Sequence, residues 1–209
     1  MNLRPIPCLY TYRCTYKGGN KMEEIELVRQ VQKGDMKAFE QLFERYKGKA
    51  VKTAYLVTGH KQMAEDIVQE AFTTCYLSIG NLKHPEYFKT WFFKLLTRIA
   101  WRMAKKEKSM MPTEEIEFLI EEAYLKEAKN PIEAKQERDF IYNEILKLDY
   151  KLQTTLILYY YNGLTIKEIA KVMGCLEGTV KSRLHTARKK LKLHLLEEEG
   201  VRSKEAFGI

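Results

Sequence analysis

Hydrophobic residues recur along this chain at spacings of three and four, the period of a helix with one buried face. The clearest stripe lies near the C-terminus and consists of Val180, Leu184, Ala187, Leu191 and Leu195. Similar stripes occur over residues 25–104 and again from residue 132 onward. The chain is therefore predicted to be all-α, with two small helical domains joined by a flexible linker and a helix-turn-helix in the C-terminal domain.

The predicted helix-turn-helix begins with a capping box. Thr165 and Glu168 form a T-x-x-E pattern, which satisfies free backbone N–H groups at a helix start. Gly174 supplies the turn, since glycine adopts positive φ without steric cost. The next helix has an apolar side and a basic, polar side, as does a helix that enters the DNA major groove. The alternative is a helical hairpin with a solvated charged face.

The N-terminal part is predicted to contain four helices. The first spans residues 25–33 and is closed by Gly34; Asp35 is the expected N-cap of the second, which runs to Val57. The third covers 63–77, and its polar side includes Asp66, Gln69 and Glu70. A polar side of this kind is most often only solvated.

A loop at residues 78–86 leads into a fourth helix that is both aromatic and basic. Aromatic side chains that stack on bases, beside cations that follow the backbone, are typical of sites for single-stranded nucleic acid. The alternative is that the aromatic residues all belong to the core.

Composition divides the chain into five segments. Residues 1–21 lack periodicity and are either a disordered tail or a mis-assigned start before Met22. Domains are predicted at 22–104 and 136–196, the acidic segment 105–135 is the linker, and 197–209 is a polar tail.

The formal net charge is +8, with a pI near 9.1, which favours an anionic partner. Between Thr165 and Lys192 there are eight Lys/Arg and two Asp/Glu, a local charge of +6. The four cysteines are scattered, with no C-x-x-C or Cys/His pair at ligand spacing, so neither a metal site nor a disulfide framework is expected. No cofactor is implied. No apolar run approaches the roughly 20 residues that span a bilayer, and we expect a cytoplasmic protein without direct membrane insertion.

Two motifs together resemble bacterial RNA polymerase sigma factors of the extracytoplasmic-function type, in the sigma-70 family. The first is AEDIVQEAF at residues 64–72. The second is GLTIKEIA at 163–170, followed by GTVKSRL at 178–184. A weaker match is FKTW at 88–91. The resemblance covers roughly residues 25–196.

This resemblance implies a transcription initiation factor that binds core RNA polymerase and recognises the −10 and −35 promoter elements. The implied partners are the β′ clamp helices and β flap of polymerase, promoter DNA and an anti-sigma factor, with nucleoid association when polymerase is bound. The implied polymerase contacts are Asp66, Gln69 and Glu70. The implied −10 contacts are Asn81, Lys83, His84, Phe88, Trp91, Arg98 and Arg102. The implied −35 contacts are Gly178, Thr179, Lys181, Ser182, Arg183, His185, Thr186 and Arg188.

The sequence departs from the family pattern at three places. Residues 95–98 read LLTR where many members have I-A-R-N. The proline of L-P-x-x-x-R before the helix-turn-helix is missing at 148–153. Thr186 stands where arginine is common.

Two other classes of protein were weighed against this interpretation. A stand-alone helix-turn-helix regulator would bind its operator without polymerase. The polar face formed by Asp66, Gln69 and Glu70 would have no role in such a protein. A nuclease or recombinase needs a metal-binding carboxylate set or an activated nucleophile. The four histidines have no partner at ligand spacing. The protein is therefore not expected to be an enzyme.

Overall fold

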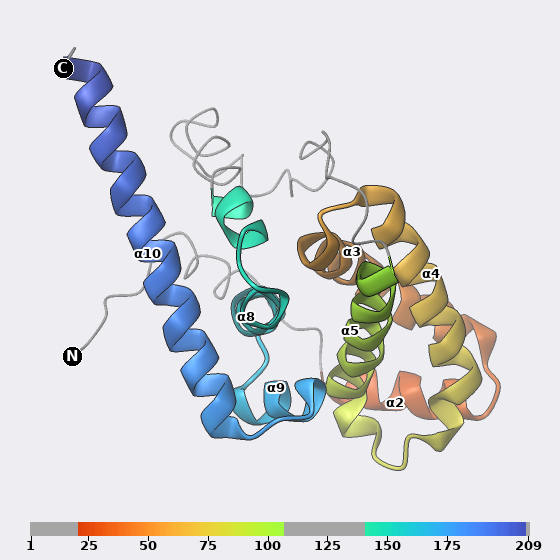
Figure 1. The fold of residues 1–209 in the computed structure, drawn as a ribbon. Coiled ribbons are helices and arrows are strands. Elements are labelled where there is room, and N and C mark those ends of the chain that lie inside the picture. Colours follow the sequence, from red (N-terminus) through yellow and green to blue (C-terminus); the bar gives the residue numbers. More distant parts are fainter. Residues whose placement is uncertain (1–20, 107–140, 208–209) are drawn as a thin grey trace.

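The structure is a computed structural model that describes residues 21–106 and 141–207, with side chains as far as Leu193. Most of the predicted N-terminal tail and linker lies outside the described residues. All regular secondary structure in the described residues is helical, and they contain no strand, which confirms the all-α prediction. The helices form two groups, α2 to α5 and α8 to α10 (Figure 1).

The N-terminal group consists of four helices and two short 3₁₀ turns. The first helix starts earlier than predicted, at Lys21, and Gly34 after it has a φ of 93°. The first turn lies within the predicted loop at 78–86, and the second begins in that loop and ends one residue beyond it, at Tyr87. The bounds are α2 Lys21–Gln32, α3 Met36–Thr58, α4 Lys61–Ser78, η1 Ile79–Asn81, η2 Pro85–Tyr87 and α5 Phe88–Lys106.

The second helix begins where the sequence predicted. The carboxylate of Asp35 accepts hydrogen bonds from the backbone N–H groups of Lys37 (2.9 Å) and Ala38 (3.2 Å). These bonds satisfy two donors that have no partner within the helix. Asp35 is therefore the N-cap of α3.

An aromatic cluster forms the core of this domain. Phe88, Phe92 and Phe93 of α5 are fully buried. The ring of Tyr46 on α3 meets those of Phe88 and Phe92 edge-on, at centroid distances of 5.3 and 5.5 Å. The Tyr46 hydroxyl donates to Glu24 Oε2 (2.7 Å), so one side chain joins α2, α3 and α5.

The C-terminal group carries the helix-turn-helix. A helical turn at 141–146 precedes α8 Tyr150–Leu156, which runs into a π-helical segment η4 Ile157–Tyr161. The helix-turn-helix follows as α9 Ile166–Met173 and α10 Glu177–Phe207. The last helix therefore extends past residue 196, where the predicted domain ends. Four members of its predicted stripe are buried, Val180, Leu184, Ala187 and Leu191.

The two groups contact each other. Helix α9 packs against α5, and α8 with η4 packs against α3 (Figure 1). Within the described residues, no helix is both long enough and apolar enough to cross a bilayer.

Candidate nucleic-acid interface

The helix-turn-helix forms with the predicted capping box. The Glu168 carboxylate accepts from the Thr165 backbone N–H (2.8 Å), and the Thr165 hydroxyl accepts from the Glu168 N–H (3.3 Å). Gly174 has a φ of 62° and its N–H donates to the Ala170 carbonyl. The left-handed residue ends α9 and turns the chain toward α10.

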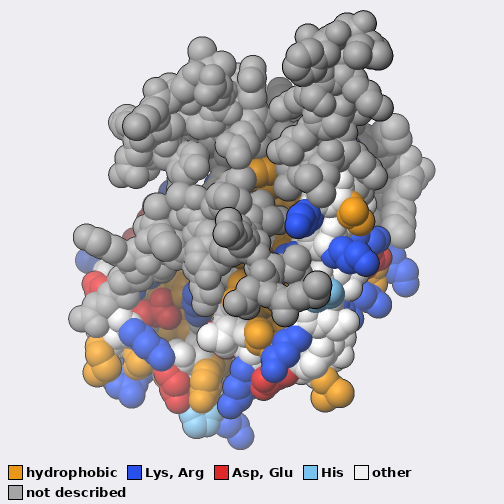
Figure 2. All heavy atoms as spheres, turned by 90° about the vertical axis from the view of Figure 1, so that its left-hand side faces the viewer, with side chains coloured by type: hydrophobic (Ala, Val, Ile, Leu, Met, Phe, Trp, Pro, Cys, Tyr) orange, Lys and Arg blue, Asp and Glu red, His pale blue; other side chains and the backbone are white. Residues whose placement is uncertain are grey.

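The polar side of α10 divides into exposed and half-buried residues. The side chains of Lys181, Ser182 and His185 are exposed, as is Gly178, whereas those of Thr179, Arg183, Thr186 and Arg188 are half-buried. Figure 2 shows the side of the molecule on which α10 lies, which is the left-hand side of Figure 1. Lys and Arg side chains are spread over its described part, and Asp and Glu are fewer.

Two arginines that the sequence predicted to face DNA, Arg183 and Arg188, also contact their own domain. Arg188 Nε donates to the Tyr160 hydroxyl (2.8 Å), and its guanidinium lies over that ring. Arg183 Nη1 lies 3.7 Å from Cys175 Sγ and 3.9 Å from Met173 Sδ. Their spacing along the helix did not indicate these contacts, because the partners come from η4, the end of α9 and the turn after it. The side chains that are exposed and so better placed to contact DNA are those of Lys181, Ser182 and His185.

The Glu168 carboxylate also reaches the other domain. Thr90 Oγ1 on α5 donates to Glu168 Oε1 (3.1 Å). Burial by itself raises the pKa of Glu168, but the hydrogen bonds from Thr165 and Thr90 and the charge of Lys89 lower it below its ordinary value. Burial lowers the pKa of Lys89, and the charges of Glu168 and Glu24 oppose this shift.

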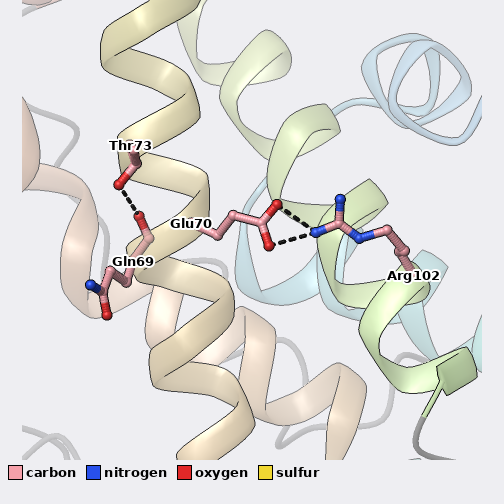
Figure 3. Close-up of polar contacts among 4 residues, drawn as sticks. All are labelled: Gln69, Glu70, Thr73 and Arg102. Atoms are coloured by element: carbon pink, nitrogen blue, oxygen red, sulfur yellow. Dashed lines mark hydrogen bonds and ion pairs between the residues drawn. The ribbon is translucent and has the colours of Figure 1, made fainter.

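The polar side of α4 is exposed as its sequence pattern predicts. Its apolar side is buried, and Asp66 and Gln69 point outward into solvent. Glu70 differs from these two, because both of its carboxylate oxygens accept from Arg102 Nη2 on α5 (Figure 3). The side chains of this pair are 40% and 62% exposed. A predicted polymerase contact and a predicted −10 contact therefore bind each other at the surface.

The predicted −10 loop is held in place by a residue that sequence reasoning missed. Gln32 Nε2 donates to the backbone carbonyls of Ile79 (2.9 Å) and Leu82 (2.8 Å). Asn81, Lys83 and His84 beside them are exposed. Gln32 ends α2, some fifty residues away in sequence, and no local pattern connects it with the loop.

Phe88 requires a correction. It was predicted to contact −10 DNA, yet its side chain has no exposed surface and packs beside Tyr46 and Phe92. A fully buried ring cannot stack on a base, so Phe88 belongs to the core. Trp91 is half-buried and Arg98 is exposed, so both side chains can still reach a partner at the surface. Thr97, in the segment that departs from the family pattern, is buried with no hydrogen-bond partner for its hydroxyl.

The described residues contain no group of three or more His, Cys, Asp or Glu side chains that could hold a metal ion. The site is a set of exposed polar and basic surfaces on helices. A helix-turn-helix of this kind, packed beside a second helical domain, defines a class of DNA-binding protein.

Comparison with known proteins identifies the family. Residues 42–110 match the model for sigma-70 region 2, and residues 141–191 match the model for sigma-70 region 4. The chain is 30% identical over 178 residues to the ECF RNA polymerase sigma factor SigW of Bacillus subtilis, covering 80% of this chain and 94% of the relative. It is 31% identical to the ECF RNA polymerase sigma-E factor of Escherichia coli K12, covering 78% and 88%.

A solved structure, that of CnrH in complex with the cytosolic domain of CnrY, has a similar fold. The TM-score is 0.63 at 21% identity, over 83% of this chain and 97% of the solved one. The chain belongs to the sigma-70 family, as a sigma factor of the extracytoplasmic-function type. It is a promoter-specific transcription initiation factor and not an enzyme, and a stand-alone regulator is not favoured.

The Gln32 contacts give a testable prediction. Gln32→Leu removes both hydrogen bonds to the loop, which we expect to cost about 1–2 kcal/mol of local stability. Hydrogen exchange of the backbone amides at 79–84 should therefore quicken about tenfold. The control is Gln30→Leu, a glutamine on the same helix whose side chain faces the exposed Glu26. Equal exchange in the two variants would contradict a role for Gln32 in holding the loop.

Proposed function

We propose that three surfaces of this chain divide the work of initiation. Asp66 and Gln69 on α4 bind the β′ clamp helices of core polymerase. The loop at 78–86, with Trp91 and Arg98 on α5, captures the −10 element. Lys181, Ser182 and His185 on α10 read the −35 element, and the C-terminal domain binds the β flap.

The polar side of α4 is the observation that supports this proposal best. Asp66 and Gln69 are exposed opposite Ala64, Ile67 and Ala71, which have no exposed surface. Such a helix contributes one side to its own core and leaves the other side free for a partner. The Glu70–Arg102 pair, next to this face, joins it to α5. Polymerase and the −10 DNA then bind neighbouring parts of one domain.

The α10 surface suits the entry of a helix into the major groove. Gly178 and Ser182 are small and exposed, so they allow close approach, while Lys181 can reach phosphate or guanine. Arg183 and Arg188 fix the position of α10 on η4 and the turn. They therefore orient the groove-facing residues and are not themselves the first choice for base contacts.

The polymerase contact can be tested with a double variant. Asp66→Ala with Gln69→Ala should reduce co-purification with core polymerase and run-off transcription at least tenfold, because it removes two exposed polar groups from the proposed contact. The matched control is Glu40→Ala with Gln41→Ala, an exposed acid and glutamine on α3. If the double variant assembled holoenzyme like the control, the polymerase surface would lie elsewhere.

The DNA contact can be tested by salt dependence. Each neutralised phosphate contributes roughly 0.9 to the slope of log K against log salt concentration. With reconstituted holoenzyme on a duplex that carries both elements, Lys181→Ala should flatten this slope by about 1. Lys37→Ala, an exposed lysine on α3, should leave it unchanged. An unaltered slope in Lys181→Ala would remove that residue from the interface.

We further propose that a separate anti-sigma protein controls this chain in the cytoplasm. Both domains are assigned to initiation, and an uncontrolled promoter-selecting subunit would compete for polymerase continuously. Affinity purification of the tagged chain from uninduced cells should recover a second protein in near-equal amount, which core polymerase displaces in vitro. Recovery of polymerase alone, while the target promoters are silent, would reject this control and point to synthesis or degradation of the chain.

A further inference from the structure

Two exposed side chains at the start of α10 lie outside the predicted −35 contacts. Leu176 is 79% exposed, the most exposed large hydrophobic side chain among the described residues. Glu177, where α10 begins, is also exposed. The start of α10 lies beside α9 at one end of the C-terminal domain (Figure 1), and in a helix-turn-helix this end of the second helix enters the major groove. Both side chains therefore lie where base edges come within reach.

Leu176 occupies a position that commonly holds a capping side chain. Its backbone carbonyl accepts from the N–H groups of Thr179 (3.0 Å) and Val180 (3.2 Å), which makes it the N-cap of α10. Asp35 and Thr165 fill the same position in α3 and α9, and each accepts backbone hydrogen bonds through its side chain. A leucine side chain cannot do this. A residue that breaks a local rule of helix formation is expected where a site has another use for it.

Glu177 is an acid within a basic surface. Between Thr165 and Lys192 there are eight Lys/Arg and two Asp/Glu, and the other acid, Glu168, is engaged in the cap of α9. Within the described residues, the Glu177 carboxylate makes no hydrogen bond or ion pair, although Lys181 lies one helical turn further along the same side. A carboxylate beside DNA is repelled by the phosphates, so it weakens binding unless it accepts a hydrogen bond from a base.

The helix surface next to these two residues leaves room for another molecule. Gly178 is exposed, and a Cβ atom at this position would meet no atom of the described residues within 4 Å outside its own stretch of helix. Packing inside the domain therefore does not require glycine there. Ser182, one turn further along, is also small and exposed. DNA can approach the start of α10 closely enough for Leu176 and Glu177 to reach the bases.

The chemistry of the two side chains selects pyrimidines. In the major groove, a carboxylate accepts a hydrogen bond from the N4 amino group of cytosine, and an apolar side chain packs against the C5 methyl group of thymine. Guanine N7 and O6 and thymine O4 are acceptors, so they repel a carboxylate. Adenine carries the N7 acceptor beside its N6 donor, an arrangement that suits an amide better than a carboxylate.

We propose that Glu177 and Leu176 are specificity-determining residues, which select a cytosine and an adjacent thymine in the −35 element. The inference rests on the proposed function, in which α10 enters the major groove at that element. Lys181 and the other cations of α10 supply attraction to the phosphates. Glu177 contributes discrimination among bases at some cost in overall affinity.

Base preference can be measured with reconstituted holoenzyme. A promoter that the holoenzyme transcribes is selected from a genomic library, its −35 element is fully randomised, and the transcribed sequences are counted. The parent should prefer C at one position and T beside it. Glu177→Gln should reduce the preference for C about tenfold and raise that for A, because an amide pairs with N6 and N7 of adenine. Leu176→Ser should reduce the preference for T severalfold and leave that for C unchanged.

Matched controls separate base reading from a structural role. Glu40→Gln on α3 and Leu193→Ser, at an exposed leucine further along α10, should keep the parent preferences. An acid in the first turn also stabilises a helix through its dipole, but that role changes thermal unfolding and not the base that is preferred. Glu177→Gln should in addition bind non-specific duplex DNA more tightly, since it removes a negative charge from the interface. Circular dichroism checks that each variant is folded.

The outcomes distinguish this inference from the proposed function. If Glu177→Gln and Leu176→Ser keep the parent preferences while Lys181→Ala weakens transcription, the inference is overturned and the proposed function stands. An equal loss of preference at every randomised position would reflect a displaced α10 and would also overturn the inference. A parent holoenzyme that transcribes without any base preference in the −35 element would overturn both.

Discussion

The Glu168 carboxylate connects the DNA-binding motif with the rest of the molecule. One oxygen accepts from the backbone and hydroxyl of Thr165 and thereby starts α9, while the other accepts from Thr90 on α5. The hydrogen bonds and the nearby Lys89 keep this carboxyl ionised despite its burial. A single acid thus caps the first helix of the helix-turn-helix and joins it to α5 of the N-terminal domain.

The features predicted correctly from the sequence are those that depend on residues close together along the chain. The buried stripe of α10, the Asp35 cap, the capping box and the turn at Gly174 all involve residues within a few positions of one another. Helical periodicity and cap chemistry operate over that range, so a stretch of sequence contains the whole cause. The exposed polar side of α4 was predicted in the same way, because the apolar residues of that helix fill one complete side and leave the polar residues on the other.

The sequence failed where the cause lies far away along the chain. Phe88 was assigned to DNA because an aromatic residue beside a basic helix suits either a base or a core, and only Tyr46 and Phe92 decide between them. The contact of Arg188 with Tyr160 was not foreseen, because Tyr160 lies on η4, far from Arg188 along the chain. Gln32 was overlooked because its acceptors are backbone carbonyls, which have no sequence signature.

The two kinds of contact in this molecule differ in what their loss would cost. Inside each domain, stripes of aromatic and aliphatic side chains exclude water, and exposing one large side chain costs roughly 1.5–3 kcal/mol. Between the domains, the bonds from Gln153 and Asn162 exchange for bonds with water at much smaller net cost. Each of these bonds therefore contributes less to stability than one large side chain in either core.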